Sequence, residues 1–334
     1  MKTLLSGIQP SGTFTIGNYI GAINNWLNPG EDFRTFIFIA DLHALTAGPE
    51  PAALRQNTLA SAAMLLACGV NPEAQTLYVQ SHVPAHSELA WILNCYTMFG
   101  EAKRMTQFKD KSARRPDNIN VGLFSYPVLQ AADILLLQSD LVPVGADQKQ
   151  HLELARDLAV RFNNRYSPTF KVPEAFIPAY GGRIMSLADP SVKMSKSDEN
   201  PNAYIALTDT DDEIRRKFKR AVTDSGGTVK YCKEQPGISN LLTIYAAFKG
   251  RAPHEAKGKI ADAEKECAGM SYAAFKDSVA EAVISVVRPI RAKYEKLLKD
   301  KEYLNAALQK GAQTAAYEAR KTLDKVKRKV GLYS

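Results

Sequence analysis

Apolar and polar residues follow one another along the first part of the chain in blocks that predict strands followed by helices. Residues 33–40 are mostly aromatic or β-branched, which predicts a buried strand. The next blocks predict a helix over residues 51–68, a strand over 76–80 and a helix over about 86–99. This alternation is typical of an α/β protein with a Rossmann-like, doubly wound parallel sheet.

The start of the chain has the pattern of a strand, a turn and a helix. Apolar residues 4–5 precede the turn residues 10–12, and a helical pattern begins at about Asn18. The first N–H groups of such a helix are unpaired and favour a phosphate, and Gly17 would let a base or phosphate approach the backbone. Side-chain partners at this turn would be Gln9 and Ser11. A glycine turn can also merely redirect the chain.

An apolar run over residues 128–137 contains a single acidic residue, Asp133. Residues 125–127 predict the start of this helix, with a proline in the first turn. Spacings of three and four place Tyr126, Gln130 and Asp133 on one face. A carboxylate in such surroundings needs a hydrogen-bond donor. The donor could come from a ligand, or Asp133 could simply cap or pair with a neighbouring basic residue.

The following segments complete the sheet. Residues 141–144 predict a short strand, and a helix is expected from Gln148, with Asp147 as its N-cap and Gln150 reaching back to the cap. Residues 171–184 return the chain to the sheet.

Beyond residue 200 the patterns predict helices, with no strong strand alternation. The expected helices cover residues 211–222, 237–248, 272–299 and 301–329. The chain has 334 residues, which suits two domains, and we expect a Rossmann-like domain over residues 1–200 and an all-α domain over residues 201–334.

Two polar segments carry concentrated positive charge. Residues 101–115 are basic with few large apolar residues, which predicts a solvated loop. Residues 193–197, Lys-Met-Ser-Lys-Ser, lie between Pro190 and Pro201 and predict an exposed loop. Two lysines three positions apart could hold a triphosphate and stabilise leaving pyrophosphate, although a solvated loop is the alternative.

Composition limits the class of protein. Apolar residues make up 45% of the chain and charged residues 23%, which is ordinary for a soluble globular protein. The net charge of +8 suits a polyanionic partner without requiring one, and basic clusters at residues 215–220 and 325–329 are usually solvated helix faces. The four cysteines are far apart, so we expect no zinc or iron–sulfur site. Without a signal peptide or membrane-spanning run, the pattern predicts a cytoplasmic protein with no membrane contact.

Two signature elements and five further short segments carry a resemblance to a known family. The element Thr15-Ile16-Gly17-Asn18 resembles the His-Ile-Gly-His signature of class I aminoacyl-tRNA synthetases, and residues 193–197 match their later Lys-Met-Ser-Lys-Ser signature. With the segments Gly-Ile-Gln-Pro-Ser-Gly, Met-Thr-Gln-Phe-Lys, Ala-Ala-Asp-Ile-Leu, Val-Pro-Val-Gly and Asp-Gln-Lys-Gln-His, the chain resembles the bacterial tryptophanyl-tRNA synthetase family over almost its whole length.

The resemblance implies ATP-dependent activation of L-tryptophan followed by transfer to tRNA(Trp). It implies ATP as a substrate, Mg²⁺ with the phosphates, a homodimer, a catalytic domain over residues 1–200 and an anticodon-binding domain over residues 201–334. Residues 101–115 would act as a lid over the active site.

The same resemblance assigns site residues. Asp133 would accept the indole N–H, which donates and cannot accept. The other tryptophan contacts would be His43, Tyr126, Gln148, Gln107 and Gln130. Catalytic residues would be Lys193, Lys196 and Lys111. Contacts to ATP would be Gln9, Pro10, Ser11, Gly17, Asn18, Gly145, Ala146, Asp147, Ile184, Lys193, Met194, Ser195, Lys196 and Ser197.

The histidines are interpreted separately. His43 follows the strand at residues 33–40, at the sheet edge where open α/β folds bind ligands, although it could also be structural. A structural interpretation is favoured for His82, His86 and His151, because none has a carboxylate or nucleophile at a suggestive spacing.

Some positions depart from the family pattern. Thr15 and Asn18 replace the signature histidines, so no imidazole role is assigned to them. Gln130 stands where methionine is frequent, Leu137 where tyrosine is frequent and Ala146 where an acidic residue is usual.

Three other functions compete with this interpretation. A tyrosyl-tRNA synthetase would need groups that both donate to and accept from a phenol. A non-catalytic RNA-binding paralogue is disfavoured by the intact lysine signature, and a small-molecule nucleotidyltransferase by the helical extension.

Overall fold

Five parallel strands form the central sheet, in the order β3-β2-β1-β4-β5. The strands are β1 (Lys2–Ile8), β2 (Phe33–Ile39), β3 (Thr76–Val79), β4 (Leu141–Pro143) and β5 (Glu174–Phe176). This computed structural model describes residues 1–334 except 28–31, 115, 146–147, 177–182, 250–258 and 334. The strand order is that of a Rossmann-like sheet, which confirms the predicted fold class.

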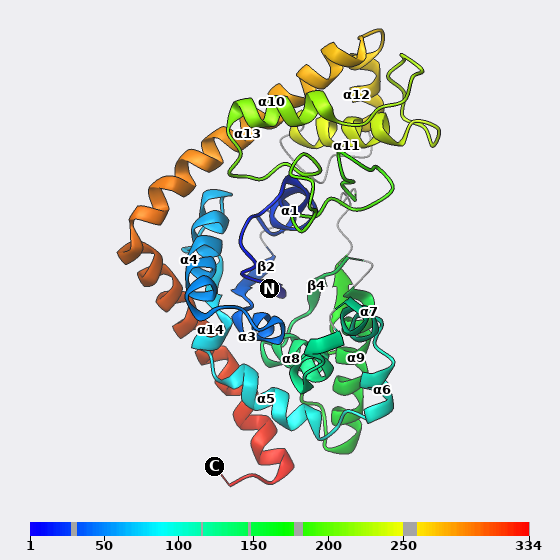
Figure 1. Ribbon diagram of the computed structural model, residues 1–334. Helices are drawn as coiled ribbons and strands as arrows, with labels where there is room; N and C mark the ends of the chain where they lie inside the picture. The colour runs from blue at the N-terminus through cyan, green and yellow to red at the C-terminus, as the bar shows by residue number, and fades with distance from the viewer. Residues whose placement is uncertain (28–31, 115, 146–147, 177–182, 250–258, 334) are drawn as a thin grey trace.

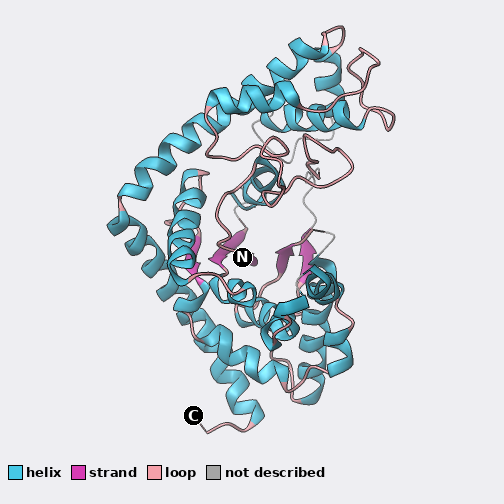
Figure 2. Ribbon diagram, viewed as in Figure 1, coloured by secondary structure: helices cyan, strands magenta, loops and turns pink. Residues whose placement is uncertain are grey.

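Helices cover both faces of the sheet and continue into a helical region (Figure 2). The first part of the chain has α1 (Ile16–Asn18), a π-helical turn (Tyr19–Ile23), α2 (Asn24–Leu27), α3 (Asp41–Ala44), α4 (Pro51–Ala67), α5 (Ala85–Asn94), α6 (Phe99–Lys103), α7 (Thr106–Arg114), α8 (Val121–Leu136) and α9 (Lys149–Arg165). The second part has α10 (Asp211–Arg220), α11 (Pro236–Lys249), α12 (Lys259–Cys267), α13 (Tyr272–Lys299) and α14 (Lys301–Val330).

The prediction of a solvated loop over residues 101–115 was wrong, because α6 and α7 occupy this segment. Phe99 and Phe108 both pack on Phe124 of α8, with ring centroids 5.0 and 5.4 Å apart. Glu101 accepts a hydrogen bond from the Met98 N–H and pairs with Arg161 of α9. These apolar and polar anchors are sparse in the sequence, which is why the segment resembled a loop.

Two helix starts also differ from the prediction. Helix α8 begins at Val121, where the Asn120 side chain accepts the Leu123 N–H at 2.8 Å, and Pro127 lies inside the helix. At α9 the N-cap is Gln148, whose side chain makes no cap.

The Gln150 side chain does not reach back to this cap. It accepts the Thr106 N–H at 2.8 Å and donates to the Arg104 carbonyl, so it joins α9 to the segment between α6 and α7. Asp147, the expected cap, lies outside the described residues. The helix expected to reach residue 99 ends at Asn94.

The helices after residue 200 share the core of the sheet domain. Helix α13 packs on α4, α10 and α11 (Figure 1), and α14 packs across β3. Phe275 of α13 and Leu304 of α14 belong to the same buried cluster as Trp26 and Ile37. In the described ranges, no helix has both the length and the apolar character to cross a membrane.

The contact between α14 and β3 predicts a sharp steric limit at Gly311. A Cβ atom there would lie 1.8 Å from the Leu77 carbonyl oxygen, so Gly311→Ala should lower the free energy of unfolding by about 1–3 kcal/mol. The control is Gly21→Ala, because a Cβ at Gly21 meets nothing within 4 Å. Urea unfolding of both variants checks the prediction, and equal stabilities would contradict it.

Candidate active site

Two adjacent clefts open at the carboxyl edge of the parallel strands, the edge at which such sheets bind ligands. The first, the lysine cleft, lies between the turn after β1 and residues 193–197. The second, the carboxylate pocket, lies among β1, β2, α8 and β4. Each has a volume of about 290 Å³, and Gln9 lines both.

The lysine cleft brings together the two signature segments. Lys196 Nζ donates to Ser11 Oγ at 2.6 Å and also to the Ser11 carbonyl. Burial lowers the pKa of Lys196 below the ordinary lysine value. The predicted residues that line this cleft are Gln9, Ser11, Asn18, Lys193, Met194, Ser195, Lys196 and Ser197.

The replacements of the signature histidines have a local structural role. Thr15 is the N-cap of α1, and its Oγ1 accepts the Asn18 N–H. Asn18 Oδ1 in turn accepts the Thr15 N–H at 2.9 Å, which completes a capping box. Gly17 is not among the residues that line the cleft. A Cβ there would lie 3.3 Å from Thr15 Oγ1 and 3.8 Å from Ile184 Cβ, so the glycine makes room for protein neighbours.

Residues 193–197 are anchored by their own core contacts. Met194 is buried, and its N–H donates to the Ile184 carbonyl at 3.0 Å. Asn240 of α11 holds the next residue, Met185, through hydrogen bonds to its N–H and carbonyl, each 2.9 Å long. Ile184 itself is buried, outside the lining of either cleft.

Asp133 lies in the wall of the carboxylate pocket and is only 1% exposed. His43 Nε2 lies 2.8 Å from Asp133 Oδ2, and Gln80 Nε2 donates to Oδ1 at 2.7 Å. His86 Nδ1 makes an ion-pair contact with Oδ1 at 2.7 Å. Burial raises the pKa of Asp133, but its hydrogen bonds to His43 and His86 and their charge outweigh burial, so the net pKa is below the ordinary value. The carboxylate is therefore held in its ionised form.

The predicted helix face does point into this pocket. Tyr126, Gln130, Asp133, His43 and Gln148 all line it. A polar chain runs along the wall: Tyr126 Oη lies 3.1 Å from His151 Nε2, and His151 Nδ1 lies 2.9 Å from Gln148 Oε1. Gln130 Nε2 donates to the same Gln148 oxygen at 3.2 Å.

Three residues of these networks were missed from the sequence. Gln80 and His86 hold Asp133, and His151 joins Tyr126 to Gln148. Asp133 and Tyr126 are distant in sequence from these residues, so spacing alone carried no signal for those contacts, whereas the contact of His151 with Gln148 spans three positions. The packing of α5 on α8 places His86 beside Asp133, and only the topology reveals that contact.

The remaining predicted residues do not line either cleft or cannot be placed. Gln107 lies on α7, and neither Pro10 nor Gly145 lines a cleft. Lys111 is also part of α7, but its side chain is not among those that the structure describes. Ala146 and Asp147 lie outside the described residues altogether. Across the described part of the chain, no group of three or more histidine, cysteine or acidic side chains is arranged to hold a metal ion.

Comparisons with known proteins agree on one family. The profile described as "tRNA synthetases class I (W and Y)" matches residues 1–288. The tryptophan–tRNA ligase of Clostridium tetani is 53% identical over 330 residues, which cover 99% of this chain and 96% of that protein. The ligase of Clostridium perfringens is 52% identical, with 99% and 98% covered.

This chain belongs to the bacterial tryptophanyl-tRNA synthetases. The tryptophanyl-tRNA synthetase structure from Mycoplasma pneumoniae superimposes with a TM-score of 0.91 and 38% identity, covering 100% of this chain and 99% of that one. The Campylobacter jejuni synthetase, solved with ADP and tryptophan, has a TM-score of 0.83 and 34% identity, covering 99% and 100%. The resemblance inferred from the signatures, including the synthetase class, is confirmed.

Because the pKa of Asp133 is lowered, its partners stabilise the fold when the carboxylate is ionised. His86→Leu should therefore cost about 2–3 kcal/mol of unfolding free energy at pH 7. The loss should shrink as the pH falls below the ordinary aspartate pKa of about 3.9, because the contribution is present above that value and disappears through the lower folded pKa. Urea unfolding across pH measures both effects.

The control for this measurement is His82→Leu, because His82 is exposed. A loss in His86→Leu that equals the control, or that stays constant on acidification, would contradict the role assigned to His86.

Proposed function

We propose that the chain activates L-tryptophan with ATP, forming tryptophanyl-AMP and pyrophosphate, and then transfers tryptophan to the 3′-terminal ribose of tRNA(Trp). One observation carries the proposal: a pocket with a buried carboxylate adjoins a cleft with two lysines, and the two share Gln9. An amino acid in the pocket would present its own carboxylate to the α-phosphate of a nucleotide in the cleft.

Recognition of tryptophan follows from the inventory of donors around Asp133. A carboxylate offers about four lone-pair sites, and three are directed at His43, Gln80 and His86. The fourth suits an indole N–H. Phenylalanine lacks this donor and would leave a buried polar site unpaired, which can discriminate by roughly 10⁴–10⁵-fold. The apolar lining fits the indole ring and consists of Leu5, Phe38, Ile134, Val142 and Val144.

The polar chain along the pocket wall would receive the ammonium group. Tyr126 and Gln148 are the proposed contacts, and His151 and Gln130 orient the Gln148 side chain. We further propose that α7 closes as a lid, which would bring Gln107 toward the amino acid and Lys111 toward the phosphates.

ATP would lie in the lysine cleft. Lys196 would exchange Ser11 for a phosphate oxygen, with Lys193 beside it. Residues 145–147 would contact the ribose, and the Ile184 backbone would contact the adenine. The other proposed contacts are Gln9, Pro10, Gly17, Asn18, Met194, Ser195 and Ser197. The Campylobacter jejuni structure with ADP and tryptophan supports both ligands.

The chemistry needs little proton transfer by the protein. The tryptophan carboxylate oxygen forms a bond to the α-phosphorus, and the bond to pyrophosphate breaks in line. The lysines stabilise the charge that grows on the leaving pyrophosphate. In the second step a terminal ribose hydroxyl of tRNA attacks the adenylate carbonyl and AMP leaves.

A magnesium ion fits this scheme as part of the substrate. None of the described residues that line the lysine cleft is a carboxylate. Because Mg²⁺ prefers oxygen ligands and commonly binds substrate phosphates, it would be carried by the ATP phosphates. There it would supply further charge neutralisation, and the lysines act alongside it.

The exposed surfaces suit the remaining partners. Exposed basic residues on α10 are proposed to contact tRNA, within an anticodon-binding region at residues 201–334; they are Arg216, Lys219 and Arg220.

Exposed apolar side chains around α5, α6 and the start of α8 support a homodimer; they are Leu45, Trp91, Met98, Phe99 and Val121. The cytoplasm is the proposed location.

Exchange of pyrophosphate into ATP tests the function. The wild-type chain should exchange with tryptophan and stay at background with phenylalanine. Asp133→Asn should weaken apparent tryptophan affinity about 10- to 100-fold, because a hydrogen bond to a charged group contributes roughly 1.5–3 kcal/mol. The control is Asp157→Asn, an exposed position on α9. Absence of tryptophan-dependent exchange would overturn the proposal, and unchanged kinetics in Asp133→Asn would overturn the role of the carboxylate.

Lys196→Ala tests the transition-state role of the lysine cleft. The rate of activation should fall by about 10²–10³-fold, as when a group that stabilises developing charge is removed, while tryptophan affinity stays within about twofold. Lys171→Ala is the control, because Lys171 pairs with Asp140 at the opposite end of the strands. Pre-steady-state exchange and tryptophan binding provide the two values, and equal losses in both would argue against this role.

A further inference from the structure

The backbone at the start of the first signature, residues 14–16, is hydrogen-bonded to a segment that leads into the helical region. Residues 205–207 pair with residues 14–16: the Ile16 N–H donates to the Ile205 carbonyl at 3.0 Å, and the Leu207 N–H donates to the Phe14 carbonyl at 2.8 Å. Phe14 and Thr15 line the lysine cleft, so one wall of that cleft depends on residues 205–207. We call residues 205–211 the connecting segment.

A buried ion pair fixes the turn of the connecting segment. Asp209 Oδ2 accepts the Ala206 N–H at 2.8 Å and also binds Lys217 Nζ at 2.6 Å. The two side chains are only 12% and 6% exposed, and Lys217 Nζ lies 5.0 Å from the Tyr204 ring centroid. Lys217 therefore does not belong to a solvated basic face, contrary to the interpretation of residues 215–220. Removing one partner of such a pair leaves a buried charge uncompensated.

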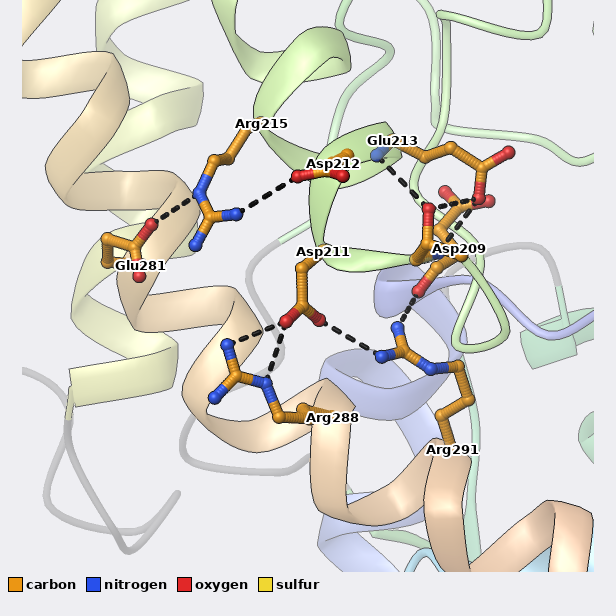
Figure 3. Close-up of polar contacts among 9 residues, drawn as sticks. Asp209, Asp211, Asp212, Glu213, Arg215, Glu281, Arg288 and Arg291 are labelled. Atoms are coloured by element: carbon orange, nitrogen blue, oxygen red, sulfur yellow. Dashed lines mark hydrogen bonds and ion pairs between the residues drawn. The ribbon is translucent and has the colours of Figure 1, made fainter.

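Two arginines of α13 fasten the other end of the segment, as Figure 3 shows. Arg291 donates to the Asp209 carbonyl and, at 3.0 Å, to Asp211 Oδ1. Arg288 Nε donates to Asp211 Oδ2 at 2.8 Å. The connecting segment is thus fixed to α10 and α13 on one side and to the cleft wall on the other.

We infer that Lys217 and Arg291 are positioning residues for ATP. Neither lines the lysine cleft, and both act through Asp209, the connecting segment and the backbone of residues 14–16. The carboxylate pocket contains none of the connecting segment or its partners. Loss of either contact therefore displaces the ATP-binding wall and leaves the tryptophan-binding wall in place. This inference rests on the proposed ATP-dependent activation.

Lys217→Met tests the inference, because methionine keeps much of the apolar stem and removes the charge. In tryptophan-dependent exchange the KM for ATP should rise about tenfold or more, since small misplacements of binding groups can cost up to about 10²-fold. The KM for tryptophan should change by less than about twofold. A folded Lys217→Met variant with the wild-type KM for ATP, or with equal rises for ATP and tryptophan, overturns the inference.

The control and a second variant keep the result interpretable. Lys310→Met makes the same replacement in an exposed ion pair between α14 and Glu73, and should leave both KM values unchanged. Arg291→Lys keeps the charge and loses the two-pronged contact to Asp209 and Asp211, and should raise the KM for ATP about threefold. If thermal melting shows that Lys217→Met is unfolded, a wild-type KM for ATP in folded Arg291→Lys overturns the inference.

Failure of the inference differs from failure of the proposed function. A wild-type chain without tryptophan-dependent exchange refutes the function. A wild-type chain that exchanges normally, with variants that match it, refutes only the positioning role.

Discussion

The site depends on keeping one carboxylate ionised inside the protein. Asp133 is almost fully buried, which disfavours its charge. His43, Gln80 and His86 offset this cost, and they come from α3, the 3₁₀ turn after β3 and α5. With three partners fixed, the ionised carboxylate has one acceptor site left for a donor on the ligand. It carries no hydrogen that it could donate. We propose that the pocket selects its ligand through the acceptor site that these three partners leave open.

The parallel sheet explains why the two clefts adjoin. All strands end at the same edge, so the turn after β1 lies between the lysine cleft and the carboxylate pocket, and Gln9 lines both. The cleft walls are also tied to the helical region, through Asn240 behind residues 193–197 and through the connecting segment behind residues 14–16. Changes in the helical region can therefore reach the walls of the lysine cleft, although none of the described residues that line it comes from that region.

The sequence was most informative where a local pattern of residues or a short motif decides the structure. It predicted β2, α4 and α13, the clustering of Tyr126, Gln130 and Asp133, and the family itself. It was wrong for residues 101–115, where Phe108 packs on Phe124 of α8, and for Lys217, which pairs with Asp209. Long-range polar pairs such as His86 with Asp133 require the topology. The roles of Lys193 and Lys196 in binding ATP stay predictions.

The most direct test of this account removes the donor from the ligand and leaves the protein intact. In β-(3-benzothienyl)alanine a sulfur atom replaces the indole N–H with little change in ring shape. Calorimetric binding to the wild-type chain should be weaker than that of tryptophan by about 10²-fold or more, because the Asp133 carboxylate would lose its donor. Equal affinities for the two amino acids would show that Asp133 does not recognise the ring nitrogen, and would contradict the account.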